Sequence, residues 1–152
     1  MQLDQLHYAI LNELQKNSRL SNTDIGRKIG LTAPAVAERI RKMEEARVIK
    51  SFTVNLDYEQ LGFNENVIIG IDIPYCDIPP FLKEIENING ILKVMKSTGD
   101  FCLIVHLVAK KVSELEEIIT RFSKHGNTST FRILAFPLER DCVELGKNNP
   151  KS

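Results

Sequence analysis

The chain has 152 residues, of which 43% are apolar and 26% are charged, and its formal net charge is zero. This length allows one domain or two small ones with hydrophobic cores, and no run approaches the roughly 20 apolar residues of a membrane-spanning helix. The first ten residues lack the pattern of a signal peptide, so we expect a cytoplasmic protein. Cys76, Cys102 and Cys142 are odd in number and unclustered, which indicates neither a disulfide framework nor a CxxC metal site.

The charge is unevenly distributed along the chain. Residues 1–50 hold nine Lys and Arg against six Asp and Glu, a net charge of +3, and residues 51–152 hold the balancing −3. A basic first third and an acidic remainder favour two domains with different partners. Chance is the simple alternative, because an imbalance of three charges is small.

Three short helices are predicted in the first 50 residues. The first follows the N-cap Asp4 and runs to about Lys16, and the second begins at Ser21, which has Asp24 at the capping-box position. Gly30 suits the left-handed end of the second helix, and Thr32 caps a third helix over residues 33–46. Their inward apolar residues are predicted to be Leu6, Ile10, Leu11, Leu14, Ile25, Ile29, Val36, Ile40 and Met43.

The tight turn between the second and third helices is typical of a helix-turn-helix that places its second helix in a DNA major groove. Small residues early in that helix let its backbone approach base edges, and longer basic residues reach phosphates or guanine. An ordinary three-helix bundle with a solvated polar face explains the spacing about equally well. Glu38 counts mildly against DNA binding, unless its carboxylate accepts a hydrogen bond from a cytosine amino group. The candidate DNA-binding residues are Ser21, Asn22, Thr32, Ala35, Glu38, Arg39, Arg41 and Lys42.

The rest of the chain predicts a strand over 51–56, a polar linker to residue 66, and then alternating strands and helices in the order βαββαβ of the ferredoxin-like split motif. The strands are expected at 67–73, 91–98, 101–109 and 128–136, and the helices at 79–88 and 113–126. Ser113 and Glu116 suggest a capping box for the second of these helices. Because the first and third strands are apolar on both faces while helices cover only one, the open sheet face predicts a two-fold dimer.

The chain resembles the Lrp/AsnC (leucine-responsive, feast/famine) family of bacterial and archaeal transcription regulators. The resemblance is carried by LD, RLS, GLT, ER and MEEARVI in the first half and by STGDFCLIVHLVA in the second, and it stops around Glu144. It implies an α+β protein with a winged-helix-like helix-turn-helix domain at 1–50, a strand and linker at 51–66, and a ferredoxin-like βαββαβ domain of the RAM type at 67–144. A polar tail follows at 145–152. The resemblance also implies binding to double-stranded DNA, no cofactor, no membrane partner, and dimers that assemble into tetramers or octamers.

In this family small ligands, usually amino acids, bind between dimers at the turn linking the two middle strands. An Asp there suits an ammonium group and backbone N–H groups suit a carboxylate, whereas the residues alone favour a plain hairpin by about two to one. The implied effector-binding residues are Thr98, Gly99, Asp100, Cys102, Thr128 and Thr130.

Two positions depart from the family pattern, which usually has Gly where Arg47 stands and Asp where Cys102 stands. A left-handed Arg47 costs roughly 1–2 kcal/mol relative to Gly. Because Cys102 lacks this carboxylate, the identity of the family's usual effector cannot be carried over to this chain. We hypothesise a preference for an apolar amino acid such as leucine or methionine.

No catalytic arrangement is visible, because His7, His106 and His125 are widely separated and neither an HExxH motif nor a glycine-rich phosphate loop occurs. A non-enzyme is therefore expected, with His106 a core or interface residue. The alternative is an enzyme like the sirohaem decarboxylases, which resemble this family in both domains and hold tetrapyrrole carboxylates with basic and histidine residues of the sheet. The corresponding groups here would be His106, Arg132, Lys93 and Lys96.

Overall fold

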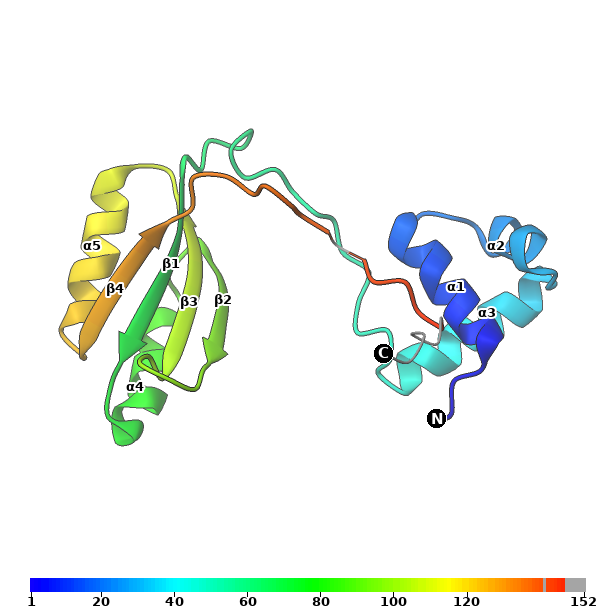
Figure 1. The fold of residues 1–152 in the computed structure, drawn as a ribbon, viewed down its shortest axis with the longest axis horizontal. Helices are drawn as coiled ribbons and strands as arrows, with labels where there is room; N and C mark the ends of the chain where they lie inside the picture. Colours follow the sequence, from blue (N-terminus) through cyan, green and yellow to red (C-terminus); the bar gives the residue numbers. More distant parts are fainter. Residues whose placement is uncertain (141, 147–152) are drawn as a thin grey trace, which may run out of the picture. The chain divides into compact units, whose positions relative to one another are not determined.

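The computed structural model describes residues 1–140 and 142–146. The chain forms two units, and each is described by itself. The first contains Met1–Asn55 together with the described residues from Leu138 onwards, and the second is Leu56–Pro137. The chain therefore passes between the units twice, once before and once after the sheet (Figure 1). No described helix combines the length and the apolar character needed to cross a bilayer.

The first unit is built from three helices, α1 (Gln5–Lys16), α2 (Asn22–Ile29) and α3 (Ala33–Glu45). The three predicted N-caps are confirmed, since the side chains of Asp4, Ser21 and Thr32 each accept a hydrogen bond from a backbone N–H of the helix that follows. Gly30 ends α2 in the left-handed conformation, with φ of 73°. The buried core of this unit consists of Ile10, Leu14, Ile25, Val36 and Met43, all of which were predicted to face inward.

The end of α3 depends on a left-handed arginine. Arg47 has φ of 55°, the one non-glycine residue with positive φ among the described residues. Its conformation turns the chain so that the N–H of Val48 donates to the carbonyl of Met43 at 2.8 Å. The predicted strand over 51–56 is wrong, because no described strand pairs with this segment, and its apolar side chains Phe52, Val54 and Leu56 are exposed.

The second unit is a four-stranded antiparallel sheet with helices on one face, which confirms the ferredoxin-like fold (Figure 1). Its elements are β1 (Glu65–Asp72), a 3-10 turn at Tyr75–Asp77, α4 (Ile78–Ile85), β2 (Ile91–Lys96), β3 (Leu103–Ala109), α5 (Val112–Ser123) and β4 (Asn127–Arg132). The strand order is β2-β3-β1-β4. Every pairing in the sheet is antiparallel, as this topology requires.

The bounds of every strand and helix in this unit differ by one or more residues from the sequence expectation, and three of these differences have a visible cause. Strand β3 begins only at Leu103, because Phe101 and Cys102 belong to the preceding loop. Strand β4 ends at Arg132, where its pairing with β1 ends. The predicted capping box of Ser113 and Glu116 is wrong, since α5 begins one residue earlier and the carboxylate of Glu114 instead accepts from the N–H of Lys110 at 3.0 Å.

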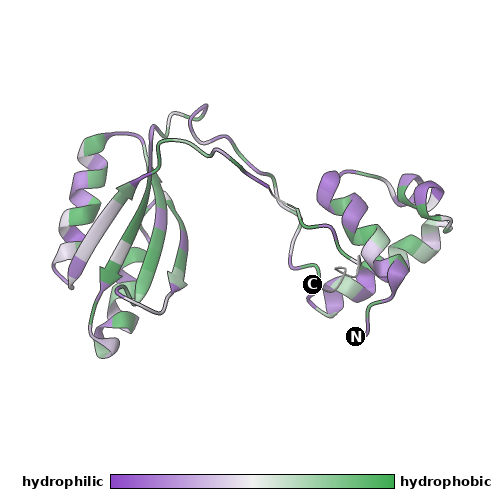
Figure 2. Ribbon diagram, viewed as in Figure 1, coloured by the Kyte–Doolittle hydropathy of each residue, from purple (hydrophilic) through white to green (hydrophobic). Residues whose placement is uncertain are grey.

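The two faces of the sheet are unlike. On one face Val67, Ile69 and Ile71 of β1 pack under α4 and α5, where the rings of Phe81 and Phe122 meet edge to face at 5.1 Å. On the other face the central strands present half-buried Ile68 and Ile104, and Phe131 of the edge strand is exposed. Figure 2 shows that β1 and β3 are mainly hydrophobic, whereas β4 is pale.

Candidate DNA-binding and effector sites

The turn between α2 and α3 depends on a close backbone approach that sequence reasoning missed. A Cβ atom on Gly26 would lie 2.4 Å from the carbonyl oxygen of Leu31, and the N–H of Leu31 donates to the carbonyl of Gly26 at 3.0 Å. Only glycine permits this approach. The available signal was the glycine in the middle of a predicted helix, which usually has a packing reason.

The beginnings of α2 and α3 present exposed hydroxyl caps. The Ser21 hydroxyl accepts from the N–H of Asp24 at 3.1 Å and donates to the Asp24 carboxylate at 2.5 Å. The Thr32 hydroxyl accepts from the N–H of Ala35 at 3.4 Å. Ser21, Asn22 and Thr32 are exposed and Ala35 is half-buried, so the small polar residues lie at two helix N-termini, where backbone N–H groups suit phosphate oxygens.

The outer face of α3 carries an ion-pair network rather than free cations. Glu38 accepts two hydrogen bonds from the Arg41 guanidinium, at 2.9 and 2.7 Å, and lies 3.4 Å from the Lys42 ammonium. Glu45 also binds Arg41. The hydrogen bond from Arg41, followed by that from Lys42, lowers the pKa of Glu38 to about 2. Glu38 therefore stays ionised and holds both cations along the helix.

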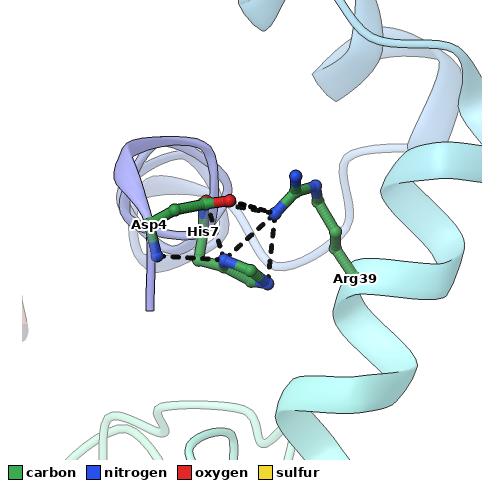
Figure 3. Close-up of polar contacts among 3 residues, drawn as sticks. All are labelled: Asp4, His7 and Arg39. Carbon is green, nitrogen blue, oxygen red and sulfur yellow. Dashed lines mark hydrogen bonds and ion pairs between the residues drawn. The ribbon is translucent and has the colours of Figure 1, made fainter. Parts of the chain in front are cut away.

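Arg39 lies between α3 and α1 (Figure 3). Its terminal nitrogen Nη1 is 2.9 Å from one Asp4 carboxylate oxygen and 3.0 Å from the other, and 3.0 Å from Nδ1 of His7. The His7 ring closes a capping box, because its Nδ1 accepts from the N–H of Asp4 at 3.2 Å. Backbone donation from His7, then the Arg39 contact, lowers the pKa of Asp4 to about 2. Arg39 thus joins the first and third helices.

The cations that are free of ion pairs are elsewhere in the first unit. Among the described residues, Arg19, Arg47 and Lys50 form no ion pair, whereas Arg27 pairs with Asp24. Arg19 precedes α2, and the other two follow α3. The basic residues predicted from the sequence all lie within α3, because helix geometry predicts which side chains point outward but not which carboxylates will neutralise them.

The loop between β2 and β3 contains four of the six predicted effector residues. Thr98, Gly99 and Asp100 are exposed, and Gly99 requires a glycine-like backbone with φ of 115°. The loop is closed by the N–H of Ser97, which donates to the carbonyl of Cys102 at 3.0 Å. The loop therefore offers one carboxylate and several backbone groups in a short exposed turn.

The side chain of Cys102 points into the protein and not into the exposed turn. Its sulfur lies 3.4 Å from the carbonyl oxygen of Ile71 and accepts from the N–H of Ile73 at 3.4 Å. The neighbouring Phe101 lies against Gly70, where a Cβ atom would come within 2.5 Å of the ring. Gly70 leaves the space that this ring occupies, so the loop is packed over the end of the open sheet face.

Thr128 and Thr130 lie on β4, whereas the other four effector candidates lie in the loop between β2 and β3. They pair with Ile71 and Ile69, so they lie on the helix-covered side of the edge strand β4. A cleft of about 490 Å³ also lies on this side, between α4, α5 and the end of β3. None of the six effector candidates lines it; its polar residues include Asn87, Asn89, Lys110, Glu114, Glu117 and Arg121.

Two of the four groups considered for tetrapyrrole binding, His106 and Arg132, are engaged within the sheet. His106 bonds to the side-chain oxygen of Asn66 at 2.8 Å, and burial, then the nearby Lys93, lowers the pKa of His106. Arg132 forms two 3.0 Å contacts with the buried carboxylate of Glu65. Within the described residues, no cluster of His, Cys, Asp and Glu could hold a metal ion.

Comparison with known proteins assigns both units. Residues 3–50 match the family model described as winged helix-turn-helix DNA-binding, and residues 66–141 match that described as Lrp/AsnC ligand binding domain. The HTH-type transcriptional regulator LrpC of Bacillus subtilis (strain 168) is 32% identical over 135 residues, which cover 89% of this chain and 94% of that protein. This chain belongs to the Lrp/AsnC family.

Solved structures of Lrp/AsnC proteins agree with this assignment. The structure of B. subtilis LrpC has a TM-score of 0.86 at 31% identity, covering 92% of this chain and all of that one. The transcriptional regulator NMB0573 of Neisseria meningitidis, solved as a complex with L-Met, has a TM-score of 0.83 at 19% identity, covering 91% of this chain and 94% of that one, and shows the shared fold. The protein is thus a DNA-binding Lrp/AsnC transcription regulator with a ligand-binding domain and not an enzyme, and no comparison supports the sirohaem alternative.

Proposed function

We propose that this regulator binds a specific operator in the cytoplasm and that its oligomeric state or DNA affinity responds to an amino acid. The observation that carries the proposal is the combination of two exposed helix N-termini in a helix-turn-helix with a second unit matching a ligand-binding domain. Such a regulator needs a DNA surface, a means of pairing its DNA-binding units, and an effector site.

The DNA surface consists of the residues singled out from the sequence. Ser21, Asn22, Thr32 and Ala35 bring the two helix N-termini close to DNA, and Arg41 and Lys42 supply phosphate or base contacts. Arg39 would add a phosphate contact only by leaving Asp4 and His7. Glu38 either contacts a cytosine amino group or competes with DNA for Arg41 and Lys42. We expect affinity to fall steeply with salt, because phosphate contacts release counterions. An affinity unchanged between low and physiological salt contradicts this surface.

The pairing surface is the sheet face that α4 and α5 leave open. Ile68, Ile104 and Phe131 supply apolar side chains on this face, where Ile68 pairs with Phe131 of β4 and with His106 of β3. A second copy related by a two-fold axis would bury it, and dimers would then assemble into tetramers or octamers. Each dimer would present two α3 helices to half-sites one helical turn, or a multiple, apart. A monomeric mass by light scattering at micromolar concentration would contradict the proposed dimer.

The effector site is the β2–β3 loop, completed across a dimer–dimer interface. Thr98, Gly99, Asp100 and Cys102 come from this loop, Thr128 and Thr130 come from β4, and a second chain would complete the site. Position 102 lacks the carboxylate of the family pattern, so we propose an apolar amino acid. The L-Met complex of the Neisseria regulator supports that class of ligand.

One experiment tests operator and effector together. Bound fragments are selected from genomic DNA with and without each amino acid, and the enriched sequences give the half-sites and their spacing. We expect two-fold symmetric sites whose recovery changes with an apolar amino acid. Calorimetry then measures direct binding; if no apolar amino acid binds, the effector class is wrong while the operator result stands.

A further inference from the structure

Helix α1 carries a second stripe of side chains that faces away from its core. Gln5, Tyr8, Asn12 and Gln15 follow one another at spacings of three and four residues, which places them on one helix face. The buried residues His7, Ile10 and Leu14 form the opposite stripe. Three amide side chains with an aromatic ring on one face of a helix form a surface that can pair with peptide backbone.

The described C-terminal residues lie along this stripe. The Asn12 amide donates to the carbonyl of Leu145 and accepts from its N–H, both at 2.9 Å. The Gln15 amide makes the same pair of hydrogen bonds with Val143, both at 3.1 Å. Alternate residues of an extended segment are thus held by their backbone groups, as a neighbouring strand would hold them.

Beyond Leu145 the segment ends at a glycine that its surroundings require. Gly146 has φ of 79°, and a Cβ atom there would lie 3.0 Å from Cβ of Tyr8 and 3.2 Å from the side-chain oxygen of Gln5. Val143 is 71% exposed, so its side chain contributes little to the contact. The site therefore binds main-chain N–H and C=O groups and requires glycine at position 146. At position 143 it excludes proline, which has no N–H to donate.

We propose that this α1 stripe is a docking site for extended backbone and that residues 142–146 of the same chain occupy it. The segment arrives from the second unit, because residues 56–137 precede it. Docking therefore gives the helix-turn-helix unit a second attachment to the ligand-binding unit, in addition to the connection before β1. When the segment is released, the helix-turn-helix unit stays attached to the ligand-binding unit only through the connection before β1.

Hydrogen exchange by mass spectrometry on the full chain tests the docking, with two substitutions at one position. Val143→Pro removes the N–H that donates a hydrogen bond to the Gln15 side-chain oxygen. Val143→Ser keeps this N–H and changes only an exposed side chain. We expect the Leu145 amide to exchange at least about tenfold faster in Val143→Pro and in Asn12→Ala, and to change less than about twofold in Val143→Ser. The amide of Ile25 in the helical core serves as the internal control for folding. Equal exchange at Leu145 in the proline and serine variants overturns the proposal.

Cross-linking tests whether the docked segment belongs to the same chain. Lys16 follows Gln15, whose side-chain amide binds the backbone of Val143, the residue after Cys142. A Lys16→Cys variant that also carries Cys76→Ser is treated with a short bismaleimide and separated on a denaturing gel. A linked product with the mass of one chain supports the proposal. A linked product with the mass of two chains shows exchange of the segment between copies and overturns it.

Discussion

The Arg41 guanidinium and the Glu38 carboxylate are joined by two hydrogen bonds, at 2.9 and 2.7 Å, along the outer face of α3. This helix therefore carries its own competitor for the phosphates that Arg41 would contact. DNA can recruit Arg41 only by replacing the carboxylate, which makes Glu38 a determinant of how tightly the regulator binds DNA without regard to sequence.

Glu38→Gln should raise affinity for a non-operator duplex and steepen its salt dependence. The isosteric amide removes the charge that holds Arg41 and Lys42, so each freed cation that reaches a phosphate adds about 0.9 to the slope of log affinity against log salt. Fluorescence anisotropy at several salt concentrations measures both. Glu44→Gln is the matched control, because this carboxylate forms no ion pair among the described residues. Equal gains in the two variants would mean that net charge alone is responsible.

Asp4→Asn should reduce thermal stability near neutral pH but not near pH 2. Contacts with His7 and Arg39 lower the pKa of Asp4 from its ordinary range to about 2. A carboxylate whose pKa is lowered by folding stabilises the fold at pH values above its pKa in the unfolded chain. This stabilisation is lost as pH falls from about 4 to about 2. Melting curves of both proteins across this range measure the difference. A constant gap at all pH values would contradict the contribution of the Asp4 charge.

Gly26→Ala should destabilise the helix-turn-helix although alanine is the better helix former. The added methyl would lie 2.4 Å from the Leu31 carbonyl oxygen, so the α2–α3 turn must shift, at a cost of roughly 1–3 kcal/mol. Helix propensity alone predicts the opposite sign, a gain of about 1 kcal/mol. Thermal melting decides between them, with Arg27→Ala on the exposed face of α2 as the control.

Arg47→Gly should stabilise the first unit. Arg47 has φ of 55°, where a side chain costs roughly 1–2 kcal/mol relative to glycine. For a unit of this size the melting temperature should rise by about 5 °C. Arg47→Ala removes the same guanidinium but keeps the Cβ atom, so it should show no such gain. A lower melting temperature for the glycine variant would mean that the arginine side chain outweighs its backbone strain.

Cys102→Asp should destabilise the second unit instead of creating a family-type ligand site. The sulfur lies against the carbonyl oxygens of Ile71 and Ile73, at 3.4 and 3.5 Å. A carboxylate there meets two acceptors and a single N–H donor, with a cost of about 1–3 kcal/mol for the poorly paired group. Cys102→Ser can still donate and accept, so it should be tolerated. Melting temperatures of the two variants provide the test, and equal values would contradict the inward orientation.

Much of the fold could be predicted because its signals are local. Asp4, Ser21 and Thr32 are caps whose role depends on a few neighbouring residues, and the strand and helix order follows from periodicity. The strand expected over 51–56 failed for the opposite reason. Alternating apolar residues describe a strand only when another strand supplies hydrogen bonds, and that partner cannot be read from the segment itself.

The candidate sites were less predictable, because side-chain partners come from distant residues. The pairing of Arg39 with Asp4 joins residues 35 positions apart, and helix geometry gave no sign of it. The inward orientation of Cys102 depends on where β1 ends, 29 residues away. Turn signals identified the β2–β3 loop, but they could not indicate that Phe101 would lie over Gly70.

The double passage of the chain between its units makes the ligand-binding unit an insertion within the DNA-binding unit. An engineered regulator that exchanges one sensor for another therefore needs two junctions, near Asn55 and Leu138, and not a single fusion point. A hybrid joined only at the first junction would lack the segment that α1 binds. A reporter fused after Gly146 would follow the motions of the helix-turn-helix rather than those of the sensor.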